Sequence, residues 1–295
     1  MFFRNRNKEF LGITYMLLCM LFFSINDAFI KYILLLYKDI TLLGEVIFIR
    51  GICSTLILGL YLHFKKKLPL NIIKSKPLHA RGAIESIAAI FFFIGLMYLP
   101  FGELYSLLNL APILITASGA FILGEKVGWR RWTAVILGFI GVMIVIKPHD
   151  LQFGFAFIYP LISAIFITQR DTITKKYLKK FDSLQVVFIT SLSVTIFFSF
   201  GMLLNYKPIN FEIFIYIFLS AIFVTIGYYF SVLTIKTANI STTSPFRYTI
   251  IIFGIILGYF IFNETPSINM LFGSLLIIGS GIFIILRQKK IGIIN

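Results

Sequence analysis

The sequence predicts an all-α membrane protein of ten transmembrane helices, built as two inverted repeats of five helices each. Three observations predict it: the composition, the length of the apolar runs, and motifs that recur half a chain apart. Apolar residues make up 59% of the 295 and charged residues only 13%, whereas a soluble domain carries about 25% charged residues. A chain without polar surface suits lipid, where each spanning segment must pair its own backbone polar groups, as a helix does.

The apolar runs are each near 20 residues long, which suits a ~30 Å hydrocarbon core at a rise of ~1.5 Å per residue. They lack the strict alternation of membrane β-barrel strands. The basic stretch before the first run resembles a signal peptide, but that run is too long and no small-residue cleavage site follows it. We therefore interpret it as the first span. The predicted spans are residues 10–31, 41–62, 80–98, 102–123, 131–147, 153–169, 185–204, 212–235, 240–262 and 268–286.

The basic residues gather in alternate gaps between the spans. Of the 27 Lys and Arg residues, 21 fall on the side that carries both termini and 4 on the opposite side, while Arg50 and Arg247 lie within spans. The positive-inside rule therefore predicts a multi-pass protein of the bacterial inner membrane with both termini in the cytoplasm. The net charge of +15 would suggest nucleic-acid binding in a soluble chain. Here orientation is the simpler cause, so we expect the lipid bilayer and no nucleic acid as partner.

Two motifs recur between the halves: an Asp and a Lys four residues apart at the end of the first span, and a Glu that closes the fourth. The matching residues are Asp27 and Lys31 against Asp171 and Lys175, and Glu125 against Glu264, at offsets of 144 and 139 residues. We predict repeats over residues 1–147 and 153–287. Since five is odd, the second repeat enters the membrane from the opposite side. Inverted repeats are typical of alternating-access carriers; the alternative is a duplication kept for packing alone.

Two arginines lie inside predicted spans, where a charge costs several kcal/mol and marks a functional candidate. By helical rise, Arg50 lies ~14 Å into the second span and Arg247 ~11 Å into the ninth. Pro245 removes a backbone donor just before Arg247, and broken helices often line transporter sites. A guanidinium suits a carboxylate or phosphate. The alternatives are a structural ion pair with Asp27 or Glu85, or snorkelling to the surface.

Polar stripes follow the first and fourth spans at helical spacing. They either line a cavity or hold helices together. Asp27 is either a proton-coupling group or the salt-bridge partner of Lys31, as Asp171 would be of Lys175. The stripes are Tyr15, Cys19, Phe22 and Asn26, and Tyr105, Asn109, Pro112 and Thr116. The predicted substrate-binding residues are Arg247, Tyr248, Arg50, Asn109 and Tyr105, with Asn26 and Asp27 as coupling candidates.

Nothing in the sequence indicates catalysis or metal binding. Cys19 and Cys53 fall in apolar runs and are interpreted as small core residues. The three histidines are too scattered for a metal site, and a set such as His-Glu-x-x-His is absent. We therefore expect no enzyme, no metal and no cofactor. Glycines in the fifth and tenth spans are expected to permit close helix approach; they are Gly138, Gly141, Gly273, Gly279 and Gly281.

With these residues placed, the chain resembles the drug/metabolite transporter superfamily, in particular its EamA-type ten-helix carriers. The resemblance covers nearly the whole chain and depends on the order and spacing of several motifs. They are Asn26-Asp27 to Lys31, Phe48-Ile49-Arg50, Gly124-Glu125, Arg131-Trp132, Gly138 to Val142 with Lys147-Pro148, Ser244-Pro245 and Asn263-Glu264. The segment Ser244 to Tyr248 is similar to that of bacterial S-adenosylmethionine carriers, whereas Glu85 departs from their pattern.

This resemblance implies that spans one to four and six to nine surround a central cavity, with spans five and ten at the periphery. It implies a secondary permease that moves a small polar organic metabolite, such as an amino acid or an S-adenosylmethionine-like solute, by alternating access. A proton or an exchanged substrate would supply the driving force, and the carrier would be a monomer or a homodimer. The alternatives are a channel, a non-transporting membrane subunit and, less favoured, a membrane-embedded enzyme.

Overall fold

Helices account for every regular element in the part of the chain that the computed structural model describes, which confirms the all-α prediction. Five of them are long and apolar enough to cross a membrane, and three more are shorter apolar helices. The second part of the fourth predicted span, with Pro112, Thr116 and Glu125, lies outside the described residues. The described residues are 2–37, 41–65, 70–110, 129–146, 151–177, 181–202, 209–238 and 243–290.

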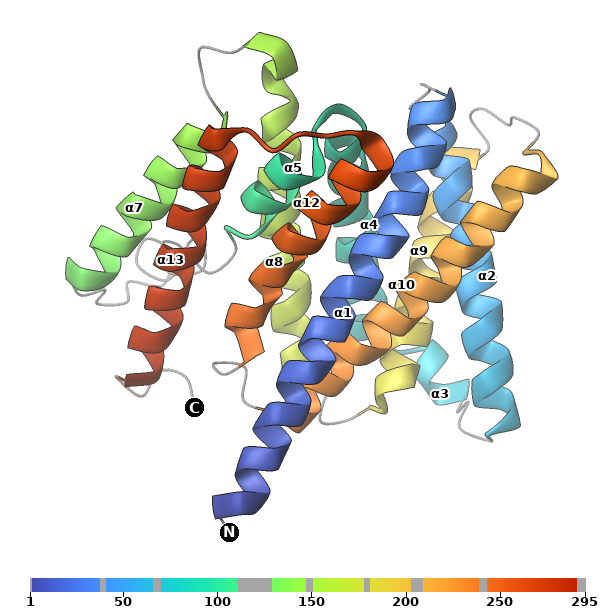
Figure 1. The fold of residues 1–295 in the computed structure, drawn as a ribbon. Helices are drawn as coiled ribbons and strands as arrows, with labels where there is room; N and C mark the ends of the chain where they lie inside the picture. The colour runs from blue at the N-terminus through green and yellow to red at the C-terminus, as the bar shows by residue number, and fades with distance from the viewer. Residues whose placement is uncertain are drawn as a thin grey trace.

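The helices follow the predicted spans in order (Figure 1). The first half contains α1 (Phe2–Tyr37), α2 (Leu42–Phe64), the short α3 (Leu70–Ile73), α4 (Lys76–Tyr98), α5 (Phe101–Leu108) and α7 (Trp129–Ile146). The second half contains η1 (Leu151–Phe157), α8 (Ile158–Tyr177), α9 (Ser183–Met202), α10 (Phe211–Thr237), η2 (Ser244–Tyr248), α12 (Thr249–Phe262) and α13 (Ile268–Lys290). Within the described residues of the ninth predicted span, a 3₁₀ segment, η2, runs into α12.

Several helices extend beyond the predicted spans, and three charges assigned to the gaps lie inside helices. Lys31 in α1, Arg81 in α4 and Arg170 in α8 are all buried. The helices extend past the predicted boundaries at these points because each cation finds polar partners elsewhere in the bundle, which hydropathy along one segment does not record. When these three are left out, 19 basic residues lie on the side with both termini and 3 on the opposite side. The predicted orientation is therefore unchanged.

The packing of the helices follows a two-fold relation between the halves. Second spans α2 and α9 pack on each other, as do α5 on α12 and α7 on α13. The contact of α1 with α10 has its counterpart in that of α8 with α4, and the contact of α4 with α9 in that of α10 with α2. In Figure 1, α1 begins and α13 ends at the same end of the bundle. This arrangement is the one expected of two five-helix repeats inverted in the membrane.

The α2–α9 crossing lies on this two-fold relation at residue level. A Cβ atom added to Gly51 would lie 2.4 Å from Oγ1 of Thr195, and these two residues are 144 positions apart in the chain, like Asp27 and Asp171. Equivalent positions of the two repeats therefore face each other here. The glycine keeps the helices close enough for the Thr55 hydroxyl to reach Ser191 and Thr195 at 2.9 and 3.3 Å.

Helices α7 and α13 form a separate pair at the left edge of Figure 1. A Cβ atom on Gly141 would lie 2.8 Å from the carbonyl oxygen of Gly273, and one on Gly273 would lie 2.6 Å from that of Gly141. This confirms the predicted close approach for these two glycines. Among the described residues, nothing lies within 4 Å of the Cβ position of Gly279, so they show no close approach there. The pair is peripheral, as the resemblance implied for spans five and ten.

Candidate functional site

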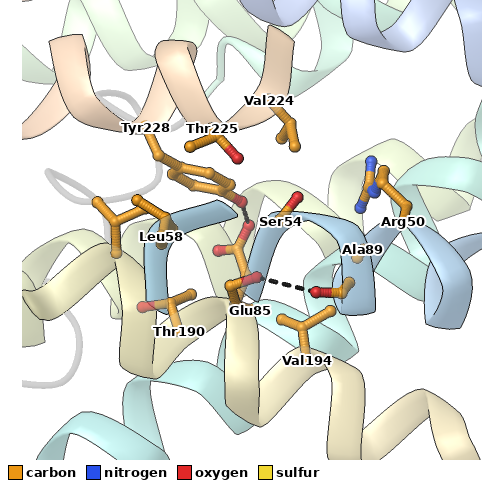
Figure 2. Close-up of a pocket in the computed structure, with 13 residues that line it drawn as sticks. Arg50, Ser54, Leu58, Glu85, Ala89, Thr190, Val194, Val224, Thr225 and Tyr228 are labelled. Carbon is orange, nitrogen blue, oxygen red and sulfur yellow. Dashed lines mark hydrogen bonds between the residues drawn. The ribbon is translucent and has the colours of Figure 1, made fainter. Parts of the chain in front are cut away.

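A buried pocket lies between α2, α4, α9 and α10 (Figure 2). These helices are the second and third spans of each repeat, so the pocket lies at the interface between the repeats, where inverted-repeat carriers usually bind substrate. Its charged lining groups are Arg50 from α2 and Glu85 from α4. Its volume is about 40 Å³, which holds a few waters but is below the ~300 Å³ of a small-molecule site. The remaining polar lining groups are hydroxyls, those of Ser54, Thr190, Ser191, Thr225 and Tyr228.

Arg50 is 8% exposed and lines this pocket. Among the described residues its guanidinium makes one hydrogen bond, from NH1 to Oδ1 of Asn26 at 3.2 Å. Its central carbon lies 5.1 Å from the centroid of the Phe93 ring. Since a guanidinium carries five N–H donors, most of them are left for a ligand in the pocket. A nearly buried cation with spare donors is suited to bind a carboxylate or phosphate.

Asn26 joins Arg50 to the buried carboxylate of Asp27. Its Oδ1 also accepts a hydrogen bond from Ser220 at 2.6 Å, and its Nδ2 donates to Oδ1 of Asp27 at 2.7 Å. The Tyr105 hydroxyl donates to the other oxygen of Asp27 at 2.8 Å. Two neutral donors therefore hold this carboxylate, and within the described residues it forms no ion pair with a cation. A carboxylate held in this way can gain a proton without losing an ion-pair partner.

Lys31 does not pair with Asp27, so the predicted i, i+4 salt bridge was wrong. Its Nζ donates to the carbonyl oxygen of Leu99 at 3.0 Å and forms an ion pair with Glu264, just past the end of α12. The other oxygen of Glu264 accepts from the backbone N–H of Phe101 at 2.9 Å and so caps the start of α5. We call Lys31, Leu99, Phe101 and Glu264 the Lys31 cluster. It ties α1, α5 and α12 together at one end of the bundle.

A second polar network begins at the pocket and runs to the opposite end of α12. Glu85 accepts from the Tyr228 hydroxyl and, at 2.7 Å, from NH1 of Arg170. Arg170 donates to Oδ1 of Asp171 from Nε at 2.9 Å and from NH2 at 2.7 Å. The other oxygen of Asp171 accepts from NH2 of Arg247 at 2.7 Å. We call these five residues the Arg170 chain. It joins α4, α8, α10 and η2.

The structure brings some of the predicted site residues together and separates others. Arg50 lines the pocket, Tyr105 reaches it through Asp27 and Asn26, and Arg247 is the last member of the Arg170 chain. The structural partner of Arg247 is Asp171, not Asp27 or Glu85, which were the alternatives from sequence.

Two predicted residues lie away from the pocket. Asn109 donates from its side chain to the carbonyl oxygen of Tyr105 at the end of α5, at 2.8 Å. Tyr248 is buried beside Gly281 of α13, and its hydroxyl has no hydrogen-bond partner among the described residues. The predicted pair of Asp171 with Lys175 lies outside the described side chains, so it stays a prediction.

Sequence reasoning missed Glu85, Tyr228 and Arg170 as site residues. Arg170 was placed in a gap, and Glu85 was considered only as an ion-pair partner. One signal could have indicated the first two: Glu85 and Tyr228 are 143 residues apart, within the range of offsets between the repeats. They are therefore equivalent polar positions on the third span of each half, and a polar pair at equivalent interior positions indicates the repeat interface.

Comparison with known proteins gives one family and several relatives. The profile of the EamA-like transporter family matches residues 10–147 and 154–287. An S-adenosylmethionine uptake transporter of Rickettsia prowazekii is 28% identical, over 95% of this chain and 94% of its own length. A riboflavin transporter of Rhizobium johnstonii is 24% identical, over 66% of this chain and 65% of its own. A protein of known crystal structure superposes with a TM-score of 0.59 at 15% identity, covering 95% of this chain and 98% of its own, and so shares the fold.

Proposed function

The chain belongs to the EamA-like transporter family, and from this premise we propose that it is a secondary carrier that moves a small polar organic metabolite by alternating access. The family and the named relatives make the chain a multi-pass membrane transporter and not an enzyme. The relatives carry S-adenosylmethionine or riboflavin by name. We propose an amino acid or an S-adenosylmethionine-like solute as the substrate, because the similarity to the first of these covers nearly the whole of both chains.

The observation that supports this proposal best is Arg50 in the pocket between the repeats. It is nearly buried, lines a cavity on the two-fold relation, and uses one of its donors on Asn26. A charge in a membrane-spanning helix is retained where it has a function or a partner. In our proposal Arg50 binds the anionic group of the substrate, and the fork of its guanidinium gives a two-point contact that an ammonium group does not.

Alternating access is supported by the two networks on either side of the pocket. The Lys31 cluster includes Glu264 after α12, and the Arg170 chain includes Arg247 before it, so they lie roughly 25 Å apart along that helix. In our proposal one network opens while the other stays closed, which exposes the pocket to one side at a time. The small volume of the pocket agrees with both networks being closed here.

The remaining predicted residues receive different roles in this proposal. Asp27 is the coupling group, held by Asn26 and Tyr105, and exchanges a proton as transport proceeds. Arg247 meets the substrate when the η2 end opens and its pair with Asp171 is released. Asn109 and Tyr248 lie outside the pocket lining, and no transport step is assigned to them.

The test is counterflow in proteoliposomes together with thermal stability of the purified protein. A carrier preloaded with unlabelled S-adenosylmethionine or an amino acid will take up the labelled compound, whereas a channel will not. A ligand at a hundredfold excess over Kd stabilises the protein by about 2.7 kcal/mol.

We expect Arg50→Lys to weaken binding tenfold or more, since a charged hydrogen bond contributes about 1.5–3 kcal/mol. Arg130→Lys, at an exposed position on α7, is the matched control. Counterflow by Arg50→Lys at wild-type affinity would contradict the proposal.

A further inference from the structure

We propose that Glu85 binds the cationic group of the substrate, opposite Arg50, and that Arg170 occupies this carboxylate while substrate is absent. The inference depends on the proposed carrier function and narrows it to one substrate class. The substrate is then a small zwitterion, whose anionic and cationic groups meet Arg50 and Glu85 in the same pocket. Binding becomes an exchange in which one cation replaces another at Glu85.

The first step of this inference depends on the charged side chains that line the pocket. Arg50 on α2 and Glu85 on α4 are both more than nine-tenths buried, at 8% and 7% exposure. They are the charged members of a lining that is otherwise made of hydroxyl and apolar side chains (Figure 2). A ligand with a single charge would satisfy one of them only. A zwitterion matches both, and a carboxylate inside a membrane-spanning helix requires a partner of opposite charge.

Arg170 is bound to Glu85 in a way that allows a substrate cation to take its place. Arg170 reaches Glu85 through NH1 alone, while its Nε and NH2 both donate to Asp171. On leaving Glu85, Arg170 would keep its two hydrogen bonds to Asp171. It would therefore still have a carboxylate as counter-charge. Glu85 would keep the Tyr228 hydroxyl on its other oxygen. The charge of Arg81 also acts on Glu85, and it would continue to do so with substrate in place.

This exchange couples substrate binding in the pocket to opening at the η2 end of the bundle. The contact between Arg170 and Glu85 ties α8 to α4, and Asp171 connects the same arginine to Arg247 in η2. When a substrate cation takes over Glu85, α8 loses this tie to α4 while the Lys31 cluster is unaffected. Substrate binding then favours opening at the η2 end, and substrate release towards that end allows Arg170 to return.

The test compares one ligand in three forms on the full-length protein in nanodiscs. The probes are S-adenosylmethionine and the common L-amino acids; each amino acid with a neutral side chain that stabilises the protein is then compared with its methyl ester and its N-acetyl derivative, because S-adenosylmethionine keeps a sulfonium cation when its amine is acetylated. We expect wild type to prefer the free zwitterion by tenfold or more, since a site built to pair a polar group rejects analogues that lack it. Glu85→Gln should lose this preference over the N-acetyl form, and Arg50→Met the preference over the ester. Glu212→Gln, on the exposed face of α10, should change neither.

A second variant separates ligand binding from a structural role. Arg170→Gln removes the competing cation, so we expect it to raise the affinity for the zwitterion several-fold, and this readout stands even if Glu85→Gln folds poorly. The inference is overturned if Glu85→Gln weakens all three forms equally, if it weakens none, or if Arg170→Gln lowers affinity for the zwitterion. If no zwitterion binds but riboflavin or a nucleoside supports counterflow that depends on Arg50, this inference fails and the carrier proposal survives.

Discussion

Lys31, Arg50 and Arg247 take their partners from other segments of the bundle rather than from their own helices. Lys31 pairs with Glu264, which follows it by more than 200 residues, although Asp27 lies one turn away on the same helix. Arg247 likewise pairs with Asp171. A buried cation must satisfy several donors at once, and residues on a neighbouring helix can approach it from directions that its own helix cannot supply. Asp27 is thereby left with neutral donors, which distinguishes it from Glu85, Asp171 and Glu264, each of which pairs with a cation.

The first residue-level prediction concerns Asp27. We expect Asp27→Asn to lose uptake driven by a pH gradient and to keep substrate exchange, because the amide can still bond Asn26 and Tyr105 but cannot carry a proton. Uptake and counterflow in the same proteoliposomes measure the two activities. Tyr105→Phe removes one donor and leaves the carboxyl group, so it is the matched control and should retain gradient-driven uptake. Full gradient-driven uptake by Asp27→Asn would exclude Asp27 from coupling.

The second concerns Arg247, which pairs with Asp171 at a half-buried position. We expect Arg247→Ala to lower the free energy of unfolding by about 1 kcal/mol, since exposed and partly exposed pairs contribute little and Asp171 keeps Arg170. Substrate affinity in the closed pocket should change less than threefold. Thermal unfolding and ligand titration of wild type, Arg247→Lys and Arg247→Ala measure both quantities. A loss of affinity of tenfold or more in Arg247→Lys, at unchanged stability, would instead mean that Arg247 already contacts the substrate in the closed pocket, before the η2 end opens.

The helix pairs of this fold differ in the kinds of side chain at their contacts. The α1–α10 contact is aromatic: Phe22 stacks on Phe223 and Phe230 at centroid distances of 5.9 Å. The stripe that begins at Tyr15 therefore holds helices together over most of its length and becomes polar only at Asn26. The α7–α13 contact depends instead on glycines that allow the two backbones to approach. Both contacts agree with helix association in lipid, which depends on close packing.

The element-level prediction concerns this glycine contact. We expect Gly273→Leu to separate α7 from α13 and to destabilise the protein by roughly 1–3 kcal/mol, the usual cost of overpacking. Gly279→Leu on the same helix is the matched control, because no described residue lies within 4 Å of its Cβ position. Thermal unfolding of both variants in detergent gives the comparison. Equal stability of the two would show that the Gly141–Gly273 approach contributes nothing.

For the whole molecule, the two-fold relation places the polar groups along one path through the bundle. The Lys31 cluster, the hydrogen bonds around Asp27, the pocket and the Arg170 chain follow one another from one end to the other. Apolar side chains such as Phe260 and Phe272 are exposed on the outside, at 76% and 63%, where lipid tails would cover them. The molecule is thus polar along its interior and apolar outside, as a carrier for a polar solute in a bilayer requires.

The prediction at this scale concerns orientation. In a background of Cys19→Ala and Cys53→Ala, we expect a cysteine at Lys66 to be shielded from a membrane-impermeant thiol reagent in intact cells and one at Lys207 to be labelled. The positive-inside rule gives this result, because the basic gaps are retained in the cytoplasm. Labelling after membrane permeabilisation, which should reach both positions, is the control. Strong labelling at Lys66 in intact cells would reverse the topology.

The class of the protein and the order of its apolar helices could be predicted from the sequence, and its two related halves were proposed from the same source. These depend on properties that lie along the chain: apolar runs long enough for a bilayer, basic gaps between them, and motifs repeated at a fixed offset. The sequence also indicated Arg50, since a charge in the middle of an apolar run is visible without any structure.

Which polar residues act together depends on the way the helices pack in three dimensions. Glu85, Arg170 and Tyr228 come from three different spans, and their contact depends on how the repeats pack, which periodicity within one helix does not contain. The same holds for Lys31, for which spacing on its own helix suggested Asp27 as partner but which pairs with Glu264, just past the end of α12. Hydropathy measures the cost of burying a charge in one segment, whereas the partner that offsets this cost is supplied by another helix. The pocket, which exists only where α2, α4, α9 and α10 meet, is therefore a property of the folded bundle.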